Sequence, residues 1–155
     1  MKIKYFLDFD IVDVPEKELQ KPLFWGKNEK GILIIVEQSA EQEALNAFVE
    51  KILAAVQLDL YRDALLLALT PDDRVSFAAL CQTYDIRYCI NFGIADRRMG
   101  LGFLWKPYQS LLHEGRYFLL ADALPMIYEE RQQGGKAMSG ALWRALQQIF
   151  KTNGL

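Results

Sequence analysis

The chain has 155 residues, 52% of them hydrophobic and 25% charged, which is the composition of one ordinary globular domain. Its apolar runs are shorter than the roughly 18–20 residues of a membrane-spanning helix, and its first residues lack the apolar core of a secretory signal. These features argue against a membrane protein and against a secreted one. We expect a single cytoplasmic domain over residues 1–155.

The net charge of −2 conceals an uneven distribution. Residues 1–96 carry a net charge of −6, whereas residues 97–155 carry +4. An excess of +4 is far below the dense basic stripe of a DNA-binding domain, so we expect any contact with nucleic acid to be indirect. The asymmetry suits an acidic partner or nucleic acid facing the second part of the chain, and chance imbalance among solvated charges is the plainer alternative.

The first 25 residues are irregular. Their apolar side chains alternate along residues 3–11, as in an edge strand or an extended arm. Three aspartates on this stretch leave two interpretations open, because they are either ligands of a metal ion or the solvated face of the strand. They are Asp8, Asp10 and Asp13.

Four apolar runs after this segment predict buried strands. They cover residues 31–37, 63–69, 86–92 and 115–121. Helical patterns alternate with them, which predicts a mainly parallel sheet between helices. Ser39 is the expected cap of the first helix, and Thr70 with Pro71 predicts that the next helix begins directly after the second strand.

The expected core combines the strands with one face of each helix. Its predicted members are Ile34, Leu45, Phe48, Ile52, Leu67, Ile90 and Leu119. Near the end of the chain, Asp122 and Ser139 are the expected caps of two helices that a Gly-Gly pair separates. In the last helix, Trp143 and Phe150 lie seven residues apart, so we expect them to pack together against the body of the domain.

A stretch of basic and aromatic residues interrupts the strand–helix rhythm between residues 94 and 114. It reads RRMGLGFLWKPYQ over residues 97–109. Such a mixture grips single-stranded nucleic acid by stacking and charge, forms a protein-binding hot spot, or covers an edge of the sheet with its rings. The sequence leaves all three interpretations open.

Residues that could carry catalysis are sparse. His113 is the single histidine, and Cys81 and Cys89 do not complete a usual zinc site with it. No nucleophile elbow and no phosphate-binding glycine motif occurs. We therefore expect no catalytic residue, no bound metal and no cofactor. The alternative is an enzyme or a nucleotide-binding protein with a site near Asp10 and His113.

Several segments, taken in order, resemble the psi subunit of the bacterial DNA polymerase III clamp-loader assembly. The matching segments lie within residues 31–150 and read ILIIVE, LLLALTPDD, RYCINFG and DALPMIYEERQQGGKAMSGALWRAL. The resemblance implies a three-layer α/β/α sandwich with a mainly parallel four-stranded sheet, like that of the uracil-DNA glycosylases. It also implies an adaptor without enzyme activity, and the catalytic motifs of the glycosylases have no counterpart in this sequence.

The favoured hypothesis is a non-catalytic adaptor in DNA replication that binds a clamp-loader subunit, with a chi-like protein as a second candidate partner. A glycosylase-fold enzyme and a self-associating domain are the alternatives. The expected contact residues come from the basic and aromatic stretch and from the N-terminal segment. They are Arg97, Arg98, Phe103, Trp105, Lys106, Tyr108, Phe6, Phe9 and Trp25.

Overall fold

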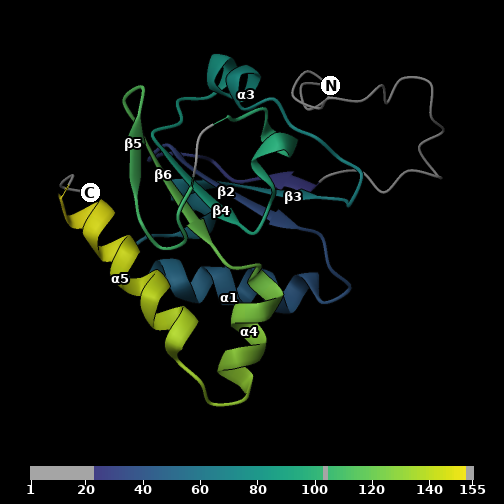
Figure 1. Ribbon diagram of the computed structural model, residues 1–155, viewed down its shortest axis with the longest axis vertical. Coiled ribbons are helices and arrows are strands. Elements are labelled where there is room, and N and C mark those ends of the chain that lie inside the picture. Colours follow the sequence, from purple (N-terminus) through teal and green to yellow (C-terminus); the bar gives the residue numbers. More distant parts are fainter. Residues whose placement is uncertain (1–22, 103–104, 153–155) are drawn as a thin grey trace.

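The computed structural model describes residues 23–102 and 105–152. Within these residues the fold is α/β, with a six-stranded mixed sheet and five α-helices. Figure 1 shows α3 (Phe77–Thr83) on one side of the sheet and three helices on the other. These three are α1 (Gln42–Ala54), α4 (Leu124–Gln132) and α5 (Ala137–Thr152). The remaining helix, α2 (Leu60–Asp63), is a single turn.

The four central strands are parallel and correspond to the four apolar runs of the sequence. They lie in the order β3 (Ala64–Leu69), β2 (Ile32–Glu37), β4 (Tyr88–Phe92) and β6 (Arg116–Ala121). Short antiparallel strands form the two edges: β1 (Leu23–Trp25) pairs with β3, and β5 (Leu111–His113) pairs with β6. The sheet in the described residues is therefore broader than the four strands predicted.

The connections between the parallel strands identify the place where such folds bind ligands. From β2 the chain passes over one face of the sheet, through α1 and α2, to β3. It returns over the other face, through α3, to β4 on the far side of β2. The two crossovers run in opposite directions across the sheet and pass over opposite faces, so they have the same handedness. The carboxyl ends of β2 and β4 form the switch point, which is the usual ligand site of open α/β sheets.

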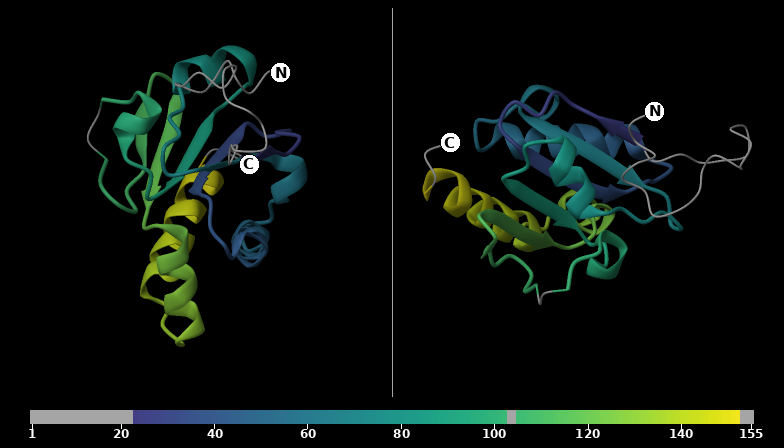
Figure 2. Two further views of the ribbon diagram at one scale, coloured as in Figure 1. Left: turned by 90° about the vertical axis from the view of Figure 1, so that its right-hand side faces the viewer. Right: turned by 90° about the horizontal axis from the view of Figure 1, so that it is seen from above.

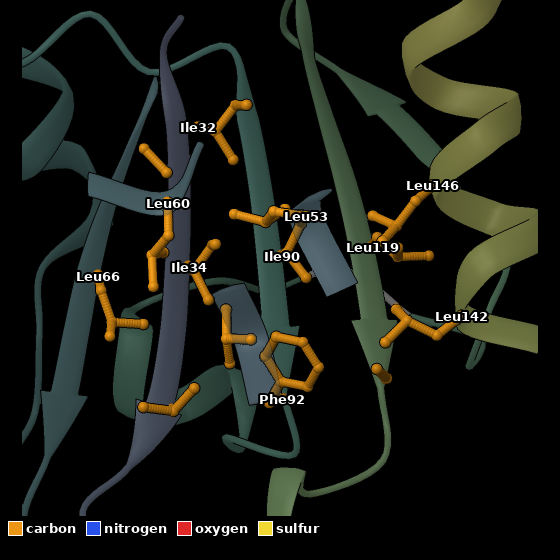
Figure 3. Packing of buried hydrophobic residues seen from close by; sticks show 14 of the residues in the cluster. Ile32, Ile34, Leu53, Leu60, Leu66, Ile90, Phe92, Leu119, Leu142 and Leu146 are labelled. Atoms are coloured by element: carbon orange, nitrogen blue, oxygen red, sulfur yellow. The ribbon is translucent and has the colours of Figure 1, made fainter. Parts of the chain in front are cut away.

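Both faces of the sheet are buried, because alternate residues of a strand point to opposite faces. Ile32 and Ile34 of β2 belong to the cluster that includes α1, α4 and α5, whereas Leu33 and Ile35 belong to the cluster that includes α3. Figure 3 shows the first cluster, in which strand residues lie opposite side chains of α1 and α5. Leu142 is one of these α5 side chains.

Two of the predicted core residues are less buried than expected. Phe48 and Ile52 are half-buried on α1, and the Phe48 ring meets Tyr128 of α4 edge-on, with 5.3 Å between ring centroids. The other predicted members are buried: Ile34, Leu45, Leu67, Ile90 and Leu119. The helical period identified the side of α1 that faces the sheet, but the neighbouring helices cover only part of the adjoining flank.

The prediction that Trp143 packs with Phe150 is wrong. Trp143 is 47% exposed, whereas Phe150 is buried against Tyr88 of β4, with 4.9 Å between ring centroids. The two side chains leave α5 in nearly the same direction, but they are separated by about 10 Å along the helix axis. Figures 1 and 2 show that α4 and the start of α5 project away from the sheet, so only Phe150 meets a strand.

The helix predicted directly after the second strand is a turn. The Asp73 carboxylate accepts a hydrogen bond from the Thr70 N–H at 2.8 Å, which closes this turn. α3 begins only at Phe77, where the Ser76 hydroxyl accepts a hydrogen bond from the Ala79 N–H at 3.2 Å. The sequence was misleading because turns and helix starts favour the same polar residues.

Two of the other three predicted caps are wrong, because Asp122 does not cap α4 and Ser139 lies inside α5. The Glu130 carboxylate, near the end of α4, instead accepts a hydrogen bond from the Met138 N–H at 2.8 Å. A side chain of the preceding helix thus reaches across the Gly-Gly turn and takes the place of a local cap.

Ser39 lies two residues before Glu41, the residue that precedes α1. Its hydroxyl accepts a hydrogen bond from the Glu41 N–H at 3.2 Å, and its N–H donates to the Gln42 side chain at 3.1 Å.

Candidate functional site

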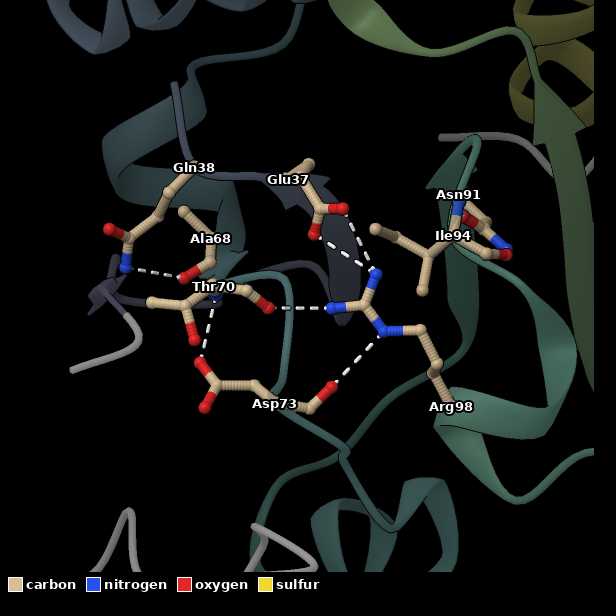
Figure 4. Close-up of polar contacts among 8 residues, drawn as sticks. All are labelled: Glu37, Gln38, Ala68, Thr70, Asp73, Asn91, Ile94 and Arg98. Atoms are coloured by element: carbon tan, nitrogen blue, oxygen red, sulfur yellow. Dashed lines mark hydrogen bonds and ion pairs between the residues drawn. The ribbon is translucent and has the colours of Figure 1, made fainter. Parts of the chain in front are cut away.

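The segment after β4 carries Arg98, whose side chain reaches the carboxyl end of β2 and the turn that follows β3, as Figure 4 shows. Its guanidinium donates to the Glu37 carboxylate at 3.0 and 3.1 Å. It also donates to the Thr70 carbonyl at 2.7 Å and to the Asp73 carbonyl at 3.1 Å. The Arg98 side chain is only 16% exposed, so we assign it to holding this edge together and not to a partner surface.

A hollow of about 500 Å³ lies beside the switch point, at the carboxyl ends of β4 and β6. Its main polar side chains bond within the protein. The Asn91 amide group bonds both backbone groups of Ile94 at 2.7 Å, and the Asp122 carboxylate accepts from the Tyr108 hydroxyl at 2.6 Å. Burial, together with this hydrogen bond, raises the pKa of Tyr108 far above its usual range. Tyr108 therefore remains a protonated donor that fixes the loop.

The structure divides the basic and aromatic stretch into exposed and covered parts. Arg97 and Lys106 are exposed. Trp105 is half-buried and lies edge-on to Phe118 of the sheet, with 5.5 Å between ring centroids. Of the three interpretations of this stretch, covering of the sheet is the one that fits Trp105. Phe103 lies outside the described residues.

The N-terminal candidates are mostly beyond the described residues, which begin at residue 23. This applies to Phe6, Phe9, Asp8, Asp10 and Asp13. Trp25 lies on the edge strand β1, half-buried against the cluster on the α1 side of the sheet. It contributes to the core as well as to the surface.

His113 lies at the end of the sheet opposite the switch point. It pairs with Arg116 at the amino end of β6, and it borders a hollow of about 400 Å³ together with Cys81. Burial raises the pKa of the Cys81 thiol, which leaves it protonated and a poor nucleophile. Among the residues that the structure describes, no cluster of three or more His, Cys, Asp or Glu side chains could hold a metal ion.

Trp143 borders a largely apolar groove of about 350 Å³, which we call the α1–α5 groove. Its lining residues are Phe48, Lys51, Ile52, Ala55, Arg131, Lys136, Ser139, Gly140 and Trp143. The groove is open because small residues, Ala55 and Gly140, stand where larger side chains would fill it. A Cβ atom added at Gly140 would meet only the end of the Arg144 side chain, at 3.4 Å.

A second hollow of about 340 Å³ adjoins the α1–α5 groove between α1 and α4. The two hollows share Phe48, Lys51 and Arg131, and the second is bordered by Tyr128. Together they form an elongated surface with aromatic side chains from three helices. Two adjoining hollows of about 340 and 350 Å³ can accommodate successive side chains of a protein segment.

Sequence reasoning assigned Trp143 to the core and so missed this groove. The spacing of Trp143 from Phe150 predicts burial, whereas Arg144 directly beside it indicates a surface role. Trp and Arg are the residues that dominate protein-binding hot spots, and this pair is the signal in the sequence that points to the groove.

No protein-family model matches the chain, and a search of curated proteins finds no match. In the described ranges no helix is both long and apolar enough to cross a membrane.

Proposed function

We propose that the chain is a non-catalytic adaptor of the replication machinery, resembling the psi subunit of the DNA polymerase III clamp-loader assembly. It acts in the cytoplasm and binds a clamp-loader subunit through the α1–α5 groove. A chi-like protein is the second candidate partner. The observation that carries the proposal is the half-exposed Trp143 at the border of an apolar groove.

The central sheet supports the resemblance in outline. Four parallel strands have helices on both faces, which agrees with an α/β/α sandwich of the uracil-DNA glycosylase type. The edge strands β1 and β5 extend this arrangement without changing its middle.

The polar groups at the switch point support an adaptor more than an enzyme. Arg98 is bound to Glu37 and to two carbonyl groups, and Asn91 is bound to the backbone of Ile94. A ligand that bound these groups directly would have to displace their bonds, and each buried polar group left without a partner costs about 1–3 kcal/mol. The polar groups beside the hollow thus already have partners in the protein, which favours the adaptor.

The exposed part of Trp143 is large enough to act as a binding hot spot. A tryptophan buries roughly 150–250 Å² when it is covered, and this one is 47% exposed. Covering the remaining area, on the order of 100 Å², yields about 2–3 kcal/mol at about 25 cal/mol per Å². That is the magnitude of a central interface residue.

The test is equilibrium binding of the full chain to purified clamp-loader subunits of the same organism. Trp143→Ala is expected to weaken the complex about tenfold or more. Leu112→Ala is the matched control, because Leu112 is 59% exposed on β5 and lies outside the groove. It is expected to change the affinity less than twofold.

Two outcomes would reject the proposed function. The first is that the unaltered chain binds none of the purified subunits. The second is that Trp143→Ala and Leu112→Ala have the same effect. Thermal unfolding of both variants shows that any loss of binding does not come from loss of the fold.

A further inference from the structure

Three cations border the two hollows that make up the elongated surface. Lys51 comes from α1, Arg131 from α4 and Lys136 from the residue just before α5. The residues lining both hollows include no carboxylate. Within the described part of the chain, none of the three cations forms an ion pair. They are therefore available to pair with carboxylates of a partner.

The nearest carboxylates along α4 are engaged elsewhere. Glu130 accepts the hydrogen bond from the Met138 N–H, and Glu129 accepts one from the Gln133 side chain at 3.4 Å. The first turn of α5 contains no acidic residue of its own, and the Glu130 carboxylate offsets the partial positive charge of that helix end. The charged side chains that line the two hollows are thus all cationic.

The floor between these charges is apolar. Phe48, Ile52 and Trp143 provide it, and each is at least partly exposed. Protein interfaces combine such an apolar centre with a charged, solvated rim. The charged residues of the rim here are all positive, which favours a negatively charged partner.

We propose that the α1–α5 groove binds an acidic segment of the partner protein, with a large apolar side chain of that segment seated against Trp143. This inference rests on the proposed function for the existence of a partner, and it adds the chemistry of the segment that is recognised. Carboxylates on either side of the anchor face Lys51, Arg131 and Lys136. The length of the two adjoining hollows favours several successive side chains over a single small ligand.

The experiment uses the full chain and designed 16-residue peptides. One peptide carries Leu and Phe at helical spacing with Glu elsewhere. In the second Lys replaces Glu, and in the third Ala replaces the apolar residues. A dT20 oligonucleotide serves as the nucleic-acid probe. Binding is measured by the fluorescence anisotropy of each labelled probe at two salt concentrations. The tryptophan emission of the chain is recorded as a second signal, and a change that is absent in Trp143→Phe is assigned to Trp143.

The acidic apolar peptide is expected to bind at least tenfold more tightly than the other probes. Lys51→Glu with Lys136→Glu should weaken its binding at least tenfold. Arg97→Glu with Lys106→Glu is the matched control, because it makes the same charge change at exposed residues outside the groove, and it should have less than a twofold effect. Equal effects of the two double variants, tighter binding of dT20, or self-association of the chain through the groove would overturn the inference.

The same double variants, tested with purified clamp-loader subunits, separate this inference from the proposed function. If the subunits bind both variants equally well, the acidic-segment inference fails while the adaptor function stands. If the acidic peptide binds through the groove but no subunit binds the chain, the inference stands and the proposed partner is wrong.

Discussion

Adjacent residues of the same type have different roles in this chain. Arg97 is exposed, whereas Arg98 joins β2, the turn at residues 70–73 and the 3₁₀ helix Asp96–Met99. Nothing in the sequence separates them, because both follow the third predicted strand within the same basic stretch. Only the path of the loop decides which guanidinium meets Glu37.

Arg98→Ala is expected to lower the free energy of unfolding by about 2–3 kcal/mol, since it removes charge-assisted hydrogen bonds and leaves two carbonyl groups and a carboxylate without their donor. Arg97→Ala is expected to change it by less than about 0.5 kcal/mol, as for most surface substitutions. Urea unfolding of both variants measures the difference. Equal losses would show that Arg98 does not hold the edge of the sheet.

Tyr108 gives the chain a pH-dependent contribution to stability. Burial raises its pKa above the ordinary value of 10.0, and the hydrogen bond to Asp122 acts in the same direction. Because the folded pKa lies above the unfolded one, the contribution is fully present below about pH 10 and is lost as the pH rises further. Tyr108→Phe should therefore be less stable by about 1 kcal/mol at pH 8, with a smaller difference at pH 11. A difference that stays constant with pH would contradict this assignment.

At the scale of elements, α1 shows what helical periodicity can predict and what it cannot. The period placed Leu45 in the core, and it is buried together with Val49 and Leu53 of the same helix. It could not show that α4 and α5 leave Phe48 at the edge of a groove. The cost of substitution should follow this difference in burial.

Phe150→Ala is expected to cost about 3–5 kcal/mol of unfolding free energy, which is usual for a buried phenylalanine. Phe48→Ala is expected to cost about half as much, because Phe48 is only half-buried. Guanidinium unfolding of the two variants tests the comparison. If Phe48→Ala proves the more costly change, the groove is more closed than described.

The junction of α4 and α5 depends on Glu130. Glu130→Ala should lower the free energy of unfolding by about 1 kcal/mol, the usual loss for a removed helix cap. Glu129→Ala is the control from the neighbouring residue, and it should cost less than about 0.5 kcal/mol, because Glu129 is exposed and bonds only to the Gln133 side chain. Thermal unfolding measures both, and a larger loss for Glu129→Ala would refute the capping role.

At the scale of the whole molecule, the sequence predicted the middle of the sheet and missed its edges. The four parallel strands were predicted because both of their faces are buried, which produces continuous apolar runs. The edge strands β1 and β5 have three residues each, too few for a periodic pattern. Helix starts were misplaced because contacts distant in sequence, such as that of Glu130 with Met138, replaced local caps.

The candidate site was predicted only in its composition. A basic and aromatic surface was expected, but at residues 97–109, where Trp105 lies against the sheet and Arg98 against Glu37. The exposed aromatic residue with cations around it is Trp143. Spacing along a helix gives the direction of a side chain but not what lies opposite, and that depends on how α4 and α5 project from the sheet.

The central claim is that a partner docks on the α1–α5 groove, and the three tryptophans report on it directly. Trp25 lies on the edge strand β1, Trp105 in the loop after β4, and Trp143 in the groove. Their indole N–H signals in ¹H–¹⁵N NMR spectra thus distinguish three candidate surfaces in one titration with a purified clamp-loader subunit. The expected result is that the Trp143 signal shifts or broadens while those of Trp25 and Trp105 stay in place. A titration in which the Trp105 or Trp25 signal changes and that of Trp143 does not would contradict the account.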